Sequence, residues 1–223
     1  ALFKYNDSPE LDDEYEEEPL DDDQQLESPV NFDINEVPYQ VLSEYNFYLG
    51  NMEDLIPVYG VLPYNLITPL FTDYAKKSRF IWMPKGVSAS FVNAESIFDF
   101  PTGTVLIKNF YYDNVLPGNS RKIIETRLMI KKPNEWIFAN YIWNEAQTEA
   151  TLDLTGGFVS LEWMQNGTPM SNVYRIPSEN ECLMCHKFYG NPIPVGPKPQ
   201  NINSVYNYAD GAKNQMDKWF DMG

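Results

Sequence analysis

The residues best suited to chemistry lie together in one pentapeptide near the C-terminus. The chain has only two cysteines and one histidine, and all three fall within residues 182–186, which read CLMCH. This C-x-x-C-H pattern is the attachment signature of c-type haem. Cys182 and Cys185 are spaced by one helical turn, so both thiols can bond to the vinyl groups of one porphyrin, and His186 can ligate its iron as the proximal ligand. The pattern predicts one covalent haem c at Cys182, Cys185 and His186.

Other uses of the same pentapeptide are open. A C-x-x-C pair can form a redox disulfide, although such a centre normally follows a strand in a βαβ unit, and the sequence shows no unit of that kind. A zinc site would need a fourth ligand. Glu179 or Glu181 could supply one, in a crowded geometry.

The sixth iron ligand has several candidates, because the chain has no second histidine. Met is the usual alternative and raises the reduction potential. Met216 and Met222 follow the motif and are the predicted distal ligands, although Met216 lies on an apolar helix face and could equally belong to the core. Met164 and Met170, on a predicted hairpin, are further options. An open position or a ligand from another chain is also compatible with the sequence.

Acidic residues dominate the N-terminus. The chain carries 32 acidic and 16 basic residues, for a net charge of −16, and residues 1–27 alone hold twelve acids against Lys4. This balance argues against nucleic acid and anionic membranes as partners. We expect residues 1–35 to form an acidic arm that binds a redox partner protein or a subunit of an envelope complex. The run 21–23, three aspartates, could also offer oxygen ligands to Ca²⁺, without EF-hand spacing.

The sequence divides into three predicted parts: the acidic arm (1–35), a β-rich domain (36–177) and a haem-binding module (178–223). From residue 78 the hydrophobic pattern alternates with period two, as in strands with one buried face. Residues 132–135 and the Asn166-Gly167 pair are expected to form hairpin turns. Ser178 and Glu181 have capping-box spacing for a helix through the cysteines, and 212–220 reads as a second helix. We predict a mainly β fold, an antiparallel β-sandwich or partly closed barrel, with a small C-terminal α-helical cytochrome c-like module.

The ends of the sequence suggest processing and export. No apolar run is long enough to span a bilayer, and the first residues do not read as a signal peptide. Since haem c is attached outside the bacterial cytoplasm, we expect a mature protein of the periplasm, outer membrane or cell surface. Only 37 residues follow His186, so we also expect the cytochrome-like module to be C-terminally incomplete.

The chain resembles a largely uncharacterised family of exported bacterial proteins that are regarded as c-type cytochromes and are often encoded beside parallel β-helix proteins. The resemblance covers about residues 41–223. It implies a β-rich domain followed by a cytochrome-like module, with a chain that continues past the final glycine and, in some relatives, a second haem. The position of Met216 is often Leu in the family pattern. The matching stretches are 42–50, 62–86, 98–110, 125–131, 141–152, 180–186, 196–203 and 211–223.

Three functions follow as hypotheses. The first is electron transfer by an exported, metal-binding iron protein with one haem c, acting as a carrier rather than a catalyst. The second is a structural or binding subunit of a bacterial cell-envelope complex, in which the haem is accessory. The third is a haem enzyme with an open distal site, for which the chain has no distal histidine to spare.

Overall fold

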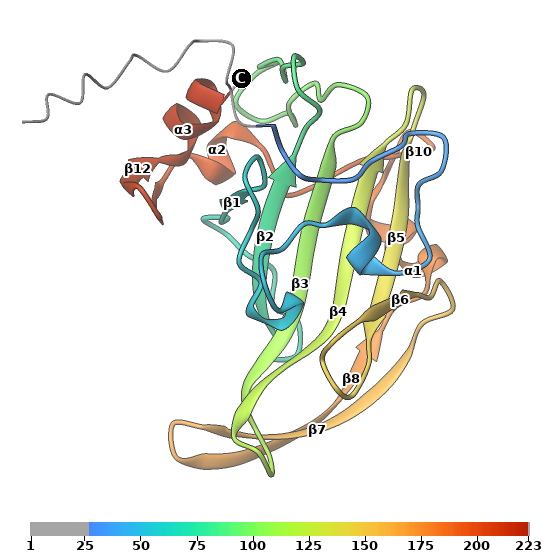
Figure 1. The fold of residues 1–223 in the computed structure, drawn as a ribbon, viewed down its shortest axis with the longest axis vertical. Helices are drawn as coiled ribbons and strands as arrows, with labels where there is room; N and C mark the ends of the chain where they lie inside the picture. The colour runs from blue at the N-terminus through green and yellow to red at the C-terminus, as the bar shows by residue number, and fades with distance from the viewer. Residues whose placement is uncertain (1–26, 223) are drawn as a thin grey trace, which may run out of the picture.

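The computed structural model describes residues 27–222, and the fold is shown in Figure 1. Residues 1–26 of the predicted acidic arm therefore lie outside the described residues. The three-aspartate run 21–23 is among them, so the predicted partner and Ca²⁺ sites in this part of the arm stay predictions. Within residues 27–222, no helix is long and apolar enough to cross a membrane.

Most strands belong to one antiparallel sheet, which confirms the mainly β prediction. Its order is β1-β2-β3-β4-β5-β6, and the β7–β8 hairpin joins the end of β3 through a pairing of Val115 with Trp163. In the described part of the chain the sheet does not close into a barrel. The strands are β1 (Leu62–Tyr64), β2 (Lys76–Trp82), β3 (Val105–Val115), β4 (Ser120–Lys131), β5 (Trp136–Trp143), β6 (Ala150–Leu152), β7 (Gly157–Gln165) and β8 (Thr168–Ile176).

The predicted hairpin turns are confirmed. Residues 132–135 connect β4 to β5, and Asn166-Gly167 connects β7 to β8. Asn166 and Gly167 both have positive φ, 50° and 79°, as a type I′ turn requires. Asn tolerates the left-handed region and Gly has no Cβ to clash, so this dipeptide fixes the register of the hairpin.

Both faces of the sheet are buried, not one as the alternating pattern predicted. One face carries Ile107 and Leu128 and is covered by the N-terminal segment 37–61, which contains two short 3₁₀ helices, Leu42–Tyr45 and Met52–Asp54. The other face carries Leu106, Met129 and Phe138, and C-terminal residues pack against it. In Figure 1 the N-terminal segment, in blue, crosses one side of strands β2 to β5. A third cluster fills the end where β7 and β8 pack.

The C-terminal segment alternates short helices and short hairpins, and an α-helical cytochrome c-like module is not confirmed in it. Residues 212–214, expected to be helical, pair with 205–207 instead, and the helix begins at Gln215. The elements are α1 (Glu179–Cys185), β9 (Lys187–Phe188), β10 (Asn191–Pro192), α2 (Pro199–Ile202), β11 (Val205–Tyr208), β12 (Gly211–Asn214) and α3 (Gln215–Met222).

Candidate functional site

Helix α1 positions the two cysteines one turn apart, as predicted. The helix begins after Ser178, whose backbone N–H donates to the Glu181 carboxylate over 2.9 Å. This half of a capping box satisfies a donor at the start of the helix. Cys182 is half-buried against the apolar cluster on the sheet, whereas Cys185 is exposed, and both are free thiols. Burial raises the pKa of the Cys182 thiol.

His186 ends this helix and is held in one orientation. Its backbone N–H donates to the Cys182 carbonyl over 3.0 Å, and its ring lies against Phe138, with 5.4 Å between ring centroids. Nδ1 lies 3.0 Å from the Ile193 carbonyl oxygen. Since a carbonyl can only accept, Nδ1 carries the proton and Nε2 keeps its lone pair. A hydrogen bond of this kind, from the ring nitrogen that does not ligate, is what orients a metal-ligating histidine. Burial lowers the pKa of His186, which favours the neutral ring.

A cleft opens between the sheet and the loop 194–197, beside Cys182 and His186. Its volume is about 100 Å³, below the roughly 300–1,000 Å³ of sites that enclose a whole small ligand. The cleft is therefore large enough for only a part of such a ligand. The sheet contributes apolar residues (Tyr64, Leu106, Ile107, Met129, Phe138) and three cations (Arg79, Lys108, Arg127) to the lining.

One of these cations has a buried carboxylate partner. Glu125 is fully buried, accepts a hydrogen bond from Arg127 Nε over 2.9 Å, and forms an ion pair with the Arg127 guanidinium. The Tyr174 hydroxyl donates to the same carboxylate over 2.6 Å. Burial alone would lower the pKa of Arg127, but the hydrogen bonds and charge of Glu125 outweigh it and raise that pKa.

The other two cations have no such partner among the described residues. Arg79 is 5% exposed and donates to the Asn65 side-chain oxygen over 3.1 Å. Lys108 lies over the Phe110 ring, with Nζ 4.6 Å from its centroid. Burial, reinforced by the charges of Arg79 and Arg127, lowers the pKa of Lys108 to about 7.

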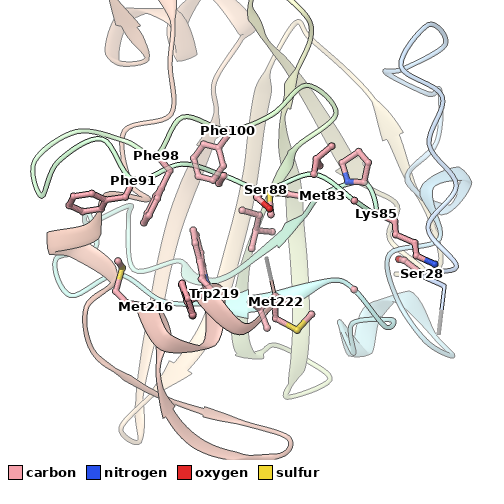
Figure 2. A pocket seen from close by; sticks show the side chains of 18 of the residues that line it. Ser28, Met83, Lys85, Ser88, Phe91, Phe98, Phe100, Met216, Trp219 and Met222 are labelled. Carbon is pink, nitrogen blue, oxygen red and sulfur yellow. The ribbon is translucent and has the colours of Figure 1, made fainter. Parts of the chain in front are cut away.

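The predicted distal ligands line a different pocket. Met216 and Met222, from α3, lie with Trp219 around an apolar pocket of about 630 Å³, shown in Figure 2. Neither lines the cleft that contains His186. Met170 packs in the cluster at the β7–β8 end, and Met164, on β7, is likewise outside the cleft lining. The methionine that does line the cleft is Met129, on β4.

The sheet residues of this cleft were not predicted from the sequence. Three neighbouring strands contribute Arg79, Lys108, Arg127 and Met129. The alternating pattern on β4 had predicted that the face with the charged residues is exposed to solvent. No signal in the sequence places these cations opposite one another, because their pairing depends on the register of the strands.

The prediction of a metal-binding iron protein is contradicted for the described residues. Among residues 27–222 no group of three or more His, Cys, Asp or Glu side chains lies close enough together to hold a metal ion. A zinc site completed by Glu179 or Glu181 is thereby also excluded. The groups that the pentapeptide offers for chemistry are therefore two free thiols and one oriented imidazole.

Comparison of the chain with models of protein families, with curated proteins and with solved structures found no match.

Proposed function

We propose that the chain is an extracytoplasmic electron-transfer protein that carries one c-type haem covalently attached at Cys182 and Cys185, with His186 facing its iron. The observation that carries the proposal is the arrangement at the end of α1. Two free thiols lie one turn apart, and the adjacent imidazole has Nδ1 engaged by the Ile193 carbonyl and Nε2 left for a ligand. The resemblance to exported c-type cytochromes supports the same assignment.

The residues present fit the group in three respects. Cys185 is exposed, so the thiol is accessible to attachment machinery, and Cys182 packs at the apolar edge of the cleft. The apolar sheet face beside His186 suits a porphyrin edge. The cations in the cleft suit its carboxylates. The iron of such a group is held by porphyrin nitrogens, so a side-chain cluster of metal ligands is not needed.

The two thiols perform the attachment. Cys182 and Cys185 would hold the group through two thioether bonds, each formed by adding an S–H across one vinyl C=C bond, with no leaving group. His186 would offer Nε2 to it while its Nδ1–H stays on the Ile193 carbonyl, which fixes the plane of the imidazole. When bound, the group supplies one-electron exchange. The sheet and α1 would hold it in a fixed position and shield part of its surface from water.

Intact-mass measurement tests the proposal. The full chain is exported in a bacterium that attaches haem c, and we expect the mass of one haem to be added. Cys182→Ala and Cys185→Ala should each lose one thioether, and the double variant should carry no covalent haem. Met184→Ala is the matched control, because Met184 lies between the cysteines but is 81% exposed and contacts no core cluster. Unmodified thiols in the wild-type protein, under conditions that mature a reference cytochrome, would overturn the assignment.

The apolar pocket favours a second candidate, a binding module. Its volume of about 630 Å³ and its lining of Met, Phe and Trp side chains suit an apolar ligand or segment. Ala89→Trp should fill this pocket and abolish the fluorescence that an anilinonaphthalene sulfonate probe gains on binding. Ala94→Trp, on the same loop but exposed and outside the lining, should not. Equal fluorescence from both variants would remove this candidate.

A further inference from the structure

The apolar pocket beside α3 has two chemically different ends. Figure 2 shows Phe91, Phe98 and Trp219 toward one end, which we call the aromatic end. Lys85 and Ser28 lie at the opposite end, which we call the lysine end. The loop that follows β2 contributes both Lys85 and Phe91, so one segment of chain lines the pocket from end to end.

The aromatic end suits a hydrocarbon chain. The Trp219 ring packs on Phe98 and Phe100, with centroids 5.5 and 6.5 Å apart, and both phenylalanines are buried. Phe91 is 61% exposed, so its ring is free to contact a ligand. A peptide segment would bring backbone N–H and C=O groups that need hydrogen-bond partners, and these side chains offer almost none. An unbranched hydrocarbon chain has no such requirement.

The lysine end suits an anion. Of the described residues that line the pocket, only Lys85 is charged. Its carboxylate neighbour is Glu27, 3.7 Å away and itself 83% exposed, and an exposed pair of this kind contributes little free energy. The backbone N–H groups of Gly86 and Ser88 have no backbone acceptor within residues 27–222. This end therefore presents a positive charge together with free donors.

We propose that the pocket binds a long-chain fatty acid, with its hydrocarbon chain against Trp219 and Phe98 and its carboxylate at Lys85. This inference rests on the second candidate function, the binding module, and names the class of its ligand. The volume of about 630 Å³ lies within the range of sites that enclose a whole small ligand. Because Lys85 is exposed, the carboxylate keeps part of its hydration while the chain is buried.

Calorimetric titration of the full chain with octanoate, decanoate and dodecanoate, each below its micelle concentration, tests the hydrocarbon part. Burial of each further CH₂ group should tighten binding by about fourfold until the pocket is filled. Decanoate and 1-decanol test the head group, because they share a chain length and differ in charge. Lys85→Gln should weaken decanoate binding by about three- to tenfold and leave 1-decanol binding unchanged.

Three further variants serve as controls. Lys76→Gln is the matched control for Lys85→Gln, because Lys76 is 62% exposed against 61% for Lys85, also pairs with a carboxylate, and lies outside the lining. It should change neither affinity. Glu27→Gln removes the carboxylate that competes for Lys85 and should tighten decanoate binding. Ala89→Trp fills the pocket and should abolish the binding of both ligands.

Two outcomes overturn the inference: an affinity that does not rise with chain length, or an equal effect of Lys85→Gln on decanoate and 1-decanol. If the fatty acids do not bind while the naphthalene sulfonate probe still binds and is lost in Ala89→Trp, the binding module stands and this ligand class is wrong. If the probe is insensitive to Ala89→Trp, the binding module itself fails.

Discussion

The hydroxyl of Tyr174 gives the sharpest test of the buried charges under the cleft. Tyr174 on β8 is fully buried and donates to the Glu125 carboxylate over 2.6 Å. The same carboxylate holds Arg127, so the hydroxyl helps to stabilise a buried negative charge. Tyr174→Phe removes this one donor and keeps the ring, which packs with Phe110 and Tyr112.

The magnitude follows from the charge of the acceptor. A hydrogen bond to a charged group contributes about 1.5–3 kcal/mol, and the loss is felt in full when the acceptor stays buried. Arg127 remains bonded to Glu125 in the variant, so the carboxylate loses one hydrogen bond but keeps its ion pair. For a chain of this size, each kcal/mol shifts the unfolding midpoint by about 2–4 °C. We therefore expect Tyr174→Phe to lower the midpoint by about 3–12 °C.

Urea unfolding with tryptophan fluorescence measures the effect, with thermal unfolding as a second readout. The slope of the free energy against urea should not change, because the same surface is exposed on unfolding. Tyr208→Phe is the matched control. Its hydroxyl is also buried but has no hydrogen-bond partner among the described residues, so its removal should be neutral or slightly stabilising. Equal stability of Tyr174→Phe and wild type, or an equal loss in Tyr208→Phe, would refute the reasoning.

Three other changes should be informative. Gly156→Ala should destabilise the protein by about 1–3 kcal/mol, because Gly156 has φ +78° and a Cβ there would lie 2.6 Å from the Ile176 carbonyl oxygen. Gly157→Ala is the control, because a Cβ at Gly157 meets nothing within 4 Å. Equal falls in the urea midpoints of the two variants would contradict this. Asn109→Ala should cost about 3 kcal/mol in the same assay, because this buried amide bonds to Tyr48, Ser78 and Thr126; a loss below 1 kcal/mol would argue against the network. Burial lowers the pKa of His186 from 6.5, so in haem-free protein the unfolded chain binds the proton first; stability should fall as pH drops below about 6.5 and level off below the folded pKa. His186→Gln should remove that part of the slope, and an unchanged pH profile would show that His186 is not the group responsible.

The strands and turns could be predicted because their signals are local. The period of two in 104–112 and 124–130, and the Asn166-Gly167 turn, depend only on neighbouring residues and match β3, β4 and the β7–β8 hairpin. The helix expected at 212–220 begins later because residues 212–214 gain strand pairing with 205–207, a contact the helical period of that segment cannot reveal.

The covering of the second sheet face could not be predicted. Glu125 and Arg127 alternate with apolar residues on β4, a pattern typical of a strand with one face in water. Here the C-terminal segment and β8 cover that face, and Tyr174, 49 positions away in the chain, supplies a partner for Glu125. The identity and spacing of Cys182, Cys185 and His186 were readable from sequence, but the cations that surround them come together only through the register of three strands.

One residue, Asn65, connects the apolar pocket with the cleft beside His186. Asn65, just after β1, accepts from Arg79 through its side-chain oxygen, while its backbone N–H donates to the Gln215 side-chain oxygen over 2.6 Å at the start of α3. Helix α3 forms a wall of the apolar pocket, and Arg79 lines the cleft beside His186. A ligand or chain segment that moves α3 would therefore also displace Asn65, the residue that accepts a hydrogen bond from Arg79. Filling the apolar pocket would then change the position of Arg79 and the shape of the cleft beside His186.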